Sequence, residues 1–226
     1  MKEKRKCPVI AIDGPVGAGK TTTARAVARR LGFLYIDTGA MYRAVTVEVL
    51  NRGADPNDES AVAAIVSDVN IDLDMGTEGQ RTILNGEDVS GRIRDRDVTN
   101  AVSAVSAMRP VRERMWAIQR RIGADGGVVM EGRDIGTVVF PDAELKVYLD
   151  ASAEVRAKRR YDELVAKGKA VPFDELCREI EARDRANTER ALAPLRLAED
   201  AVRIDTSAMT FDEQVDAIVA LVPETS

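Results

Sequence analysis

The run Gly14–Thr21 constrains the fold of this chain more than any other feature of its sequence. It reads Gly-Pro-Val-Gly-Ala-Gly-Lys-Thr, follows the short apolar run Val9–Ile12, and precedes apolar residues at helical spacing. A G-x-x-x-x-G-K-[ST] pattern between a strand and a helix is typical of a phosphate-binding loop. Its glycines allow backbone N–H groups to point at phosphate oxygens, and the positive end of the helix dipole faces the same oxygens. The pattern therefore predicts a site for the phosphates of a nucleotide.

Two side chains of this loop have expected roles of their own. Lys20 is expected to bridge the β- and γ-phosphates of a nucleoside triphosphate, and the Thr21 hydroxyl is expected to ligate Mg²⁺. The alternative is a glycine-rich turn with a purely structural purpose, and the complete match in its expected context argues against it. The expected nucleotide-binding residues of this segment are Gly14, Pro15, Val16, Gly17, Ala18, Gly19, Lys20, Thr21 and Thr22.

The composition of the chain excludes several classes of function. A net charge of −5 argues against general nucleic-acid binding, because no overall positive field attracts a phosphate backbone. The absence of histidine excludes histidine-based acid–base catalysis and histidine-ligated zinc. The basic residues are 25 Arg and 8 Lys, which suits bidentate phosphate contacts but also an arginine-biased genome. With two distant cysteines, no signal peptide and no apolar run near 18 residues, we expect a cytoplasmic protein that contacts no membrane.

Short apolar runs alternate with helical patterns along most of the chain, which predicts an α/β fold whose parallel sheet is buried on both faces. The segment 69–89 differs, because its alternating pattern and the pair Asn85-Gly86 predict a small antiparallel insertion with a hairpin. A capping-box pattern at Thr210 predicts the start of a last helix. The expected strands are 9–13, 33–36, 127–130, 145–149 and 202–205. The other expected helices are 20–31, 41–50, 58–68, 97–122 with an interruption at Pro110, 152–167 and 173–190.

Polar residues follow two of the predicted strands. In a parallel sheet, ligands collect at the carboxyl ends of the strands, so these residues are expected to face the site. For Thr38 an N-cap on the next helix is an equally good interpretation. The residues concerned are Asp37, Thr38 and Arg43 after the second strand, and Glu131, Arg133 and Asp134 after the third.

Two charged helices are predicted in the C-terminal third of the chain. A solvated surface is the default interpretation of such charge runs. The alternative is a mobile lid that closes cations over phosphates, as phosphoryl transfer requires. Arg183 and Arg190 are seven residues apart and therefore share one face of their helix, which suits two cations acting on one phosphoryl group.

Three segments together resemble the bacterial cytidylate kinases, a family of nucleoside monophosphate kinases: 37–43 (Asp-Thr-Gly-Ala-Met-Tyr-Arg), 85–90 (Asn-Gly-Glu-Asp-Val-Ser) and 131–141 (Glu-Gly-Arg-Asp-Ile-Gly-Thr-Val-Val-Phe-Pro). The resemblance extends from the phosphate loop to about residue 205. It implies a single kinase domain over 1–226: a P-loop core with a parallel five-stranded sheet, a small antiparallel β insert and a helical lid. The core would comprise about 7–68, 97–150 and 195–226, the nucleotide-binding insert about 69–96, and the lid about 152–190.

The resemblance also implies a reaction and a set of roles. ATP, with Mg²⁺, would phosphorylate CMP or dCMP, small-molecule substrates of pyrimidine nucleotide metabolism. Thr38, Arg43 and Arg133 match residues that hold the acceptor's ribose and α-phosphate, and Ser103, Arg112 and Asp134 match those that read the cytosine edge. Arg183 and Arg190 match arginines that clamp the phosphates, so Lys20, Arg133, Arg183 and Arg190 are the expected catalytic residues. Arg159 and Arg160 would lie near the donor, and Thr21 and Asp37 at the metal, with Asp37 acting directly or through water.

Asn187 departs from the family pattern, which usually has an aspartate at this place on the acceptor ribose. An amide is neutral and both donates and accepts, so the ribose contact and the preference between CMP and dCMP are open.

Rival functions make different demands on the sequence. Another P-loop nucleotide or small-metabolite kinase would not explain the β insert or the run 131–141. A GTP-dependent switch needs an Asn-Lys-x-Asp guanine reader, and no Asn-Lys pair occurs in the chain. A non-catalytic ATP-binding regulator would be expected to lack Lys20 or the arginines. No additional apolar helix face calls for a partner, so we expect a monomer.

Overall fold

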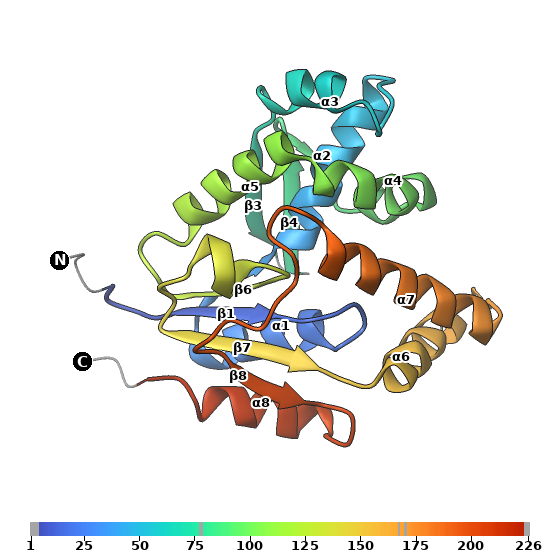
Figure 1. The fold of residues 1–226 in the computed structure, drawn as a ribbon. Helices are drawn as coiled ribbons and strands as arrows, with labels where there is room; N and C mark the ends of the chain where they lie inside the picture. Colours follow the sequence, from blue (N-terminus) through green and yellow to red (C-terminus); the bar gives the residue numbers. More distant parts are fainter. Residues whose placement is uncertain (1–4, 77–78, 167, 170, 224–226) are drawn as a thin grey trace. The chain divides into compact units, whose positions relative to one another are not determined.

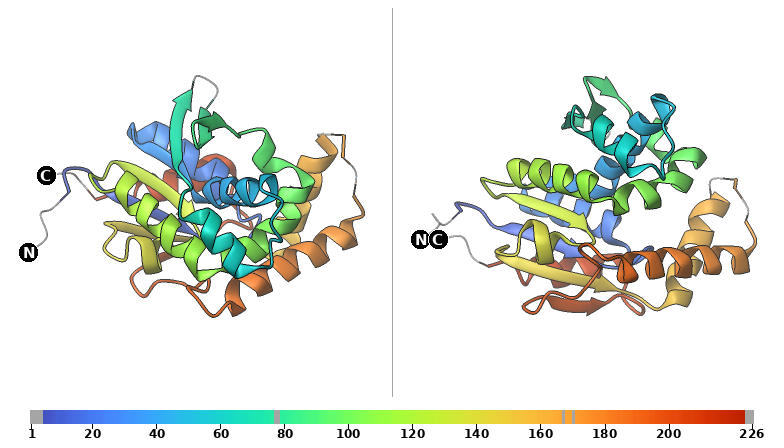
Figure 2. Two further views of the ribbon diagram at one scale, coloured as in Figure 1. Left: turned by 90° about the horizontal axis from the view of Figure 1, so that it is seen from above. Right: turned by 45° about the horizontal axis from the view of Figure 1, so that its top comes forward.

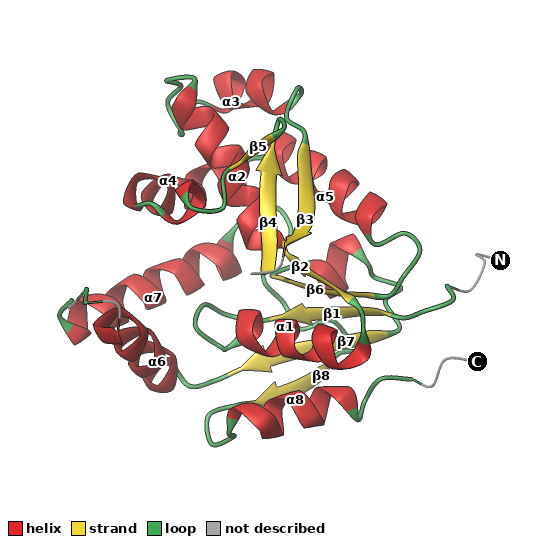
Figure 3. Ribbon diagram, turned by 180° about the vertical axis from the view of Figure 1, so that it is seen from behind, coloured by secondary structure: helices red, strands yellow, loops and turns green. Residues whose placement is uncertain are grey.

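Five parallel strands form the central sheet, in the order β2-β6-β1-β7-β8 (Figure 1; β2 is labelled in Figure 3). The computed structural model describes residues 5–76, 79–166, 168–169 and 171–223. Strand β1 (Val9–Asp13) pairs with β6 (Val128–Gly132) and with β7 (Leu145–Asp150), and β7 pairs with β8 (Val202–Asp205). In this register Asp13 lies opposite Gly132. The phosphate loop and the segment after β6 therefore start from neighbouring strand ends, as strand-end reasoning predicts.

The chain divides into two compact units. One contains the residues up to Tyr35 together with those from Asp125 onward, and the other contains Ile36–Ala124. Strand β2 (Leu34–Asp37) passes from the first unit into the second.

Helices α1 (Lys20–Leu31) and α8 (Phe211–Val219) cover one face of the sheet (Figure 3). Their apolar stripes pack against buried side chains of β1, β6, β7 and β8 in one core cluster. Gly32 ends α1 in the left-handed conformation, with φ 69°, which glycine adopts without a Cβ penalty. Thr210 and Glu213 form the predicted capping box at the start of α8.

Three further elements of the first unit follow β6 and β7. A π-helical turn, Ile135–Val139, comes directly after β6 and packs against β1. Helices α6 (Ala153–Ala166) and α7 (Phe173–Glu189) lie side by side in both views of Figure 2. The buried side chains of Ala157, Leu176 and Ile180 hold these two helices together. The charged segment predicted from the sequence is therefore a helix pair with its own small core.

The second unit is built on helix α2 (Thr38–Asn51), which packs against α4 (Arg96–Ala107) and strand β4. Helices α3 (Glu59–Val66) and α5 (Arg109–Ile122) and a short 3-10 helix, Arg92–Arg94, complete its helical part. The predicted antiparallel insertion is confirmed: β3 (Ile71–Gly76), β4 (Gly79–Leu84) and β5 (Glu87–Asp88) form a second sheet. The β4–β5 hairpin turns at Asn85 and Gly86, both with positive φ.

The predicted interruption of the helical segment near Pro110 is confirmed, two residues earlier than expected. The break lies at Met108, between α4 and α5, and Pro110 occupies the first turn of α5. The physical reason is that proline fits the start of a helix, where its missing N–H has no partner to lose. Most other predicted elements are confirmed to within two residues at each end, and α2 begins three residues earlier than expected.

Candidate active site

The phosphate loop depends on glycine at three places. Gly17 and Gly19 have φ values of 77° and 91°, in the region that side chains rarely occupy. Gly14 lies so close to β7 that a Cβ on it would approach the Leu149 carbonyl oxygen to 2.0 Å. The backbone therefore turns tightly into α1, as phosphate binding to its N–H groups requires.

Lys20 is buried at the start of α1, with 5% of its surface exposed. Its Nζ donates to the Pro15 carbonyl oxygen over 2.6 Å, so the side chain folds back over the loop. Burial, and then the nearby charge of Arg133, lower the pKa of Lys20 to about 7. An anion in the loop would reverse this effect, because it favours the charged ammonium.

Asp13 ties the phosphate loop to the segment after β6. Its two carboxylate oxygens accept from the N–H groups of Ile135, over 2.9 Å, and Gly136, over 2.8 Å. Burial raises the pKa of Asp13 to about 6, although the two backbone bonds act in the opposite direction. The neighbouring Asp134, which is also buried, precedes the π-helical turn that Asp13 holds.

Several cations gather at this end of the sheet. The positive charge of Arg133 contributes to lowering the pKa of both Lys20 and Arg183, and burial is the larger cause in each case. The carboxylate of Glu131 lies near enough to Lys20 to oppose that shift, and it accepts from the Tyr35 hydroxyl over 2.5 Å. Cations that repel one another in a partly buried place form a site that an anion would stabilise.

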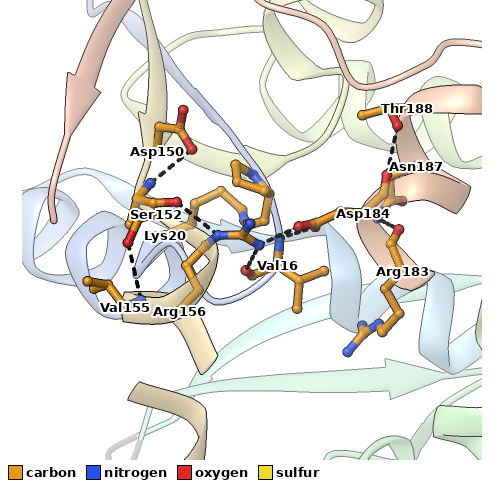
Figure 4. A network of polar contacts seen from close by, with 12 residues as sticks. Val16, Lys20, Asp150, Ser152, Val155, Arg156, Arg183, Asp184, Asn187 and Thr188 are labelled. Atoms are coloured by element: carbon orange, nitrogen blue, oxygen red, sulfur yellow. Dashed lines mark hydrogen bonds and ion pairs between the residues drawn. The ribbon is translucent and has the colours of Figure 1, made fainter. Parts of the chain in front are cut away.

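Helix α7 contacts the phosphate loop through Asp184 (Figure 4). One carboxylate oxygen of Asp184 accepts from the Val16 N–H over 3.1 Å, and the other pairs with Nη1 of Arg156. The same Nη1 donates to the Val16 carbonyl oxygen, and Nε donates to the Ala151 carbonyl oxygen, each over 2.9 Å. Arg156 is 8% exposed, so it belongs to this network and not to a solvated surface.

The structure separates the remaining arginines of α6 and α7 by their surroundings. Arg159 donates to the Thr206 hydroxyl and carbonyl oxygens, and its guanidinium lies beside Gly19. Arg160 pairs with Glu163 over 2.8 Å on an exposed surface. The Arg190 guanidinium lies 3.9 Å from Asp134, and its Nε donates to the Ala193 carbonyl oxygen over 2.6 Å.

Asn187 is directed at its own helix. Its side-chain amide donates to the Arg183 carbonyl oxygen over 2.7 Å. The residue that departs from the family pattern thus bonds to the backbone of a predicted phosphate-clamping arginine.

The second unit carries the other predicted residues. The N-cap of α2 is Asp37, whose Oδ1 accepts from the Ala40 N–H over 3.0 Å; the alternative that Thr38 caps this helix is therefore wrong. Thr38 is the first helical residue and is buried. Arg43 donates to the Ile93 carbonyl oxygen and to the Thr99 hydroxyl. Ser103 is exposed on α4, and Arg112 is buried on α5.

The fold and this site define a class of protein. A parallel sheet with a phosphate loop after its first strand, a small antiparallel insert and an arginine-rich helix pair constitute the P-loop nucleoside monophosphate kinase core. The model of the cytidylate kinase family matches residues 10–224. The chain therefore belongs to the cytidylate kinase family.

Two curated relatives agree with this membership. The cytidylate kinase of Geobacillus thermodenitrificans (strain NG80-2) is 50% identical over 222 residues, which cover 98% of this chain and 98% of that protein. The cytidylate kinase of Pelotomaculum thermopropionicum is 50% identical over 216 residues, 95% of this chain and 96% of that protein. The match to a solved shikimate kinase from Bacteroides thetaiotaomicron covers 95% of this chain and 97% of that chain. Its TM-score is 0.48 and the two sequences are 16% identical.

Sequence reasoning missed three residues of this region. Asp13 is the last residue of β1, so the strand-end rule could have indicated it. Asp184 and Arg156 gave no such signal, because each looks like one member of a charge run. Only the folded chain shows that they pair with each other and with Val16.

Proposed function

We propose that the protein transfers the γ-phosphoryl group of ATP to CMP and dCMP, giving ADP with CDP or dCDP. The observation that carries the reaction class is the tight glycine loop after β1, with Lys20 buried at the start of α1 and α7 contacting the loop through Asp184. Membership of the cytidylate kinase family supports CMP as the acceptor.

Donor binding is proposed for the phosphate loop. Its N–H groups and Lys20 would hold the phosphates of ATP, and Arg159, which lies beside Gly19, would assist them. Arg160 keeps its proposed place near the donor, although its present partner is Glu163. The loop residues proposed to contact ATP are Gly14, Pro15, Val16, Gly17, Ala18, Gly19, Lys20, Thr21 and Thr22.

We propose that Mg²⁺ binds this site together with the nucleotide and not as a permanently bound ion. In the described part of the chain, no group of three or more His, Cys, Asp or Glu side chains gathers as a ready-made metal cage. Mg²⁺ commonly keeps several waters and is bound by one or two protein groups plus substrate phosphates. We propose Thr21 as a ligand and Asp37, whose Oδ1 caps α2, as a contact either directly or through water. When bound, the metal would neutralise charge on the transferring phosphoryl group.

The reaction needs no covalent bond to the protein. We propose that Thr38, Arg43 and Arg133 hold the acceptor's ribose and α-phosphate, and that Asn187 contacts the ribose. Lys20, Arg133, Arg183 and Arg190 would align the acceptor oxygen with the γ-phosphate and stabilise the charge that develops there. Closure of α6 and α7 would exclude water and limit hydrolysis.

Base selection is proposed for Asp134, Arg112 and Ser103. The Asp134 carboxylate would accept from the cytosine 4-amino group, and Arg112 and the Ser103 hydroxyl would donate to N3 and O2. Uracil has a carbonyl oxygen in place of that amine, so two acceptors would face each other at the buried carboxylate. We expect this to lower activity with UMP by roughly 10²-fold or more.

The first experiment is a coupled ADP-release assay with ATP and Mg²⁺, offering CMP, dCMP, UMP, AMP and GMP separately. Activity with CMP and dCMP far above that with UMP is the expected result. Asp134→Ala should lose the preference for CMP over UMP, and Asp125→Ala is a matched surface control. Unchanged selectivity in Asp134→Ala contradicts the base reader, whereas ADP release that no acceptor stimulates contradicts the reaction itself.

A further inference from the structure

Trp116 is the only tryptophan of the chain, and it lies one helical turn beyond Arg112 on α5. Residues four apart share one face of a helix, and long side chains lean toward the helix N-terminus. The ring of Trp116 is therefore directed back over Arg112, and the ring centroid lies 5.5 Å from the guanidinium carbon.

A second ring reaches the same guanidinium from another helix. Tyr42, on α2, has its ring centroid 5.4 Å from the guanidinium carbon of Arg112. The Nη1 atom of Arg112 also donates to the Ser106 carbonyl oxygen over 3.0 Å. Residues of α2, α4 and α5 thus contact the same cation.

Arg112 needs such surroundings because only 1% of its surface is exposed. A buried guanidinium has lost its water and must regain favourable interactions from the protein. Aromatic faces supply them, and the attraction between a cation and a ring strengthens when both are desolvated. The two rings and the Ser106 carbonyl oxygen therefore restrict where this guanidinium can lie.

We propose that Trp116 is a positioning residue for base recognition: its ring fixes the guanidinium of Arg112 and thereby sets the affinity for the base of the acceptor nucleotide. The inference rests on the proposed function, in which Arg112 donates to cytosine. A guanidinium that can tilt must be ordered each time the base binds, and this ordering costs affinity. A guanidinium held by two rings is already oriented, so binding avoids that cost.

Trp116→Leu and Trp116→Phe test this inference. Leucine keeps an apolar side chain but removes the ring, so KM for CMP should rise on the order of tenfold while KM for ATP and kcat at saturating CMP stay near wild-type values. The ratio of kcat/KM for CMP over UMP should fall. Phenylalanine restores a ring face and should bring KM for CMP to within about threefold of the wild type. Phe211→Leu, an equivalent ring removal on α8, is the matched control and should leave KM for CMP unchanged.

Arg112→Met separates the failure of this inference from failure of the proposed function. If Arg112→Met raises KM for CMP and Trp116→Leu does not, the positioning role is overturned and the base reader stands. If Arg112→Met itself leaves KM and selectivity unchanged, the proposed base reader is wrong and the positioning role falls with it.

The wild-type protein offers a measurement that needs no foldable variant. Because Trp116 is the only tryptophan, the tryptophan fluorescence reports on the surroundings of this one ring, which contacts Arg112. Emission should change as CMP saturates the protein and should not change with ATP alone, and Arg112→Met should abolish the response. Constant emission up to saturating CMP overturns the inference.

Discussion

Two buried charged groups, Lys20 and Asp13, show how single residues of this chain depend on their surroundings. Both belong to the strand–loop–helix segment that the sequence identifies, and each has a shifted pKa because it is buried. The loop pattern predicts which lysine contacts phosphates, but it contains no information on how far burial lowers the pKa of that lysine. The sequence thus predicts the identity of Lys20, and the fold determines its protonation.

Nucleotide binding should take up protons above neutral pH. The pKa of Lys20 is about 7 in the nucleotide-free protein, and a triphosphate beside it would raise that value by favouring the charged form. About one pH unit above neutrality, Lys20 is mostly uncharged before ATP binds, so binding should take up nearly one proton. About one pH unit below neutrality, Lys20 is already mostly protonated, so the uptake should be much smaller. Calorimetric titrations in two buffers with different ionisation enthalpies measure this uptake.

Lys20→Arg is the control for proton uptake, because arginine stays charged at every working pH. Its binding heats, where measurable, should not depend on the buffer. Equal heats in both buffers for the wild-type protein would contradict the assignment of the proton to Lys20.

At the scale of elements, short-range patterns predict most of the chain. Helix α1 and strands β1 and β8 have the expected bounds, because their apolar period, glycine stop and flanking residues are local signals. The break between α4 and α5 was predicted from Pro110, but its place at Met108 was not, since methionine itself does not disfavour a helix. The sequence also left open whether α6 and α7 form a solvated surface or a lid. The sequence could not predict the core that α6 and α7 share, or the contact of Asp184 with Val16, because these contacts join segments far apart along the chain.

Asp184→Ala should loosen α7 from the phosphate loop. The substitution removes the acceptor of the Val16 N–H and the partner of a nearly buried guanidinium. We expect the free energy of unfolding to fall by about 2 kcal/mol, less than for a fully buried ion pair because Arg156 keeps two carbonyl partners. Amide exchange in α7 should accelerate.

Chemical denaturation and hydrogen exchange measure these two effects. Glu181→Ala removes a charge from the exposed surface of the same helix. It should change the free energy of unfolding by no more than about 0.5 kcal/mol and leave amide exchange in α7 unchanged. If amide exchange in α7 is as slow in Asp184→Ala as in the wild type, the Asp184 contact does not hold the helix.

At the scale of the whole molecule, the proposed residues are divided over two compact units. The phosphate loop, Arg133, Asp134 and the arginines of α6 and α7 belong to one unit, and Thr38, Arg43, Ser103 and Arg112 to the other. Among the described residues, no helix is both long enough and apolar enough to cross a membrane. The stability of the first unit includes the cost of ionising Asp13 inside it.

Stability should therefore contain a component that falls with rising pH. The pKa of Asp13 is about 6 in the native protein and 3.8 ordinarily, so between these values the native protein binds more protons than the unfolded chain. The contribution of Asp13 is present below about pH 4 and is lost as the pH rises through about 6. Two pKa units correspond to about 3 kcal/mol.

Urea denaturation of the wild type and of Asp13→Asn across this pH range measures the component. Asparagine does not titrate, so the difference in unfolding free energy between the two proteins should shift by that amount over the range. A difference that is independent of pH would show that Asp13 titrates normally in the native protein.

The sequence by itself determined the phosphate loop, the alternation of strands and helices, the β insert and the resemblance to cytidylate kinases, because each depends on residues close together along the chain. The tertiary structure alone decided that Asp184 meets Val16 across 168 residues, that Lys20 and Asp13 are buried, and that two rings face Arg112. Burial and long-range contacts arise when the whole chain packs, and no local pattern encodes which distant side chains will then be neighbours.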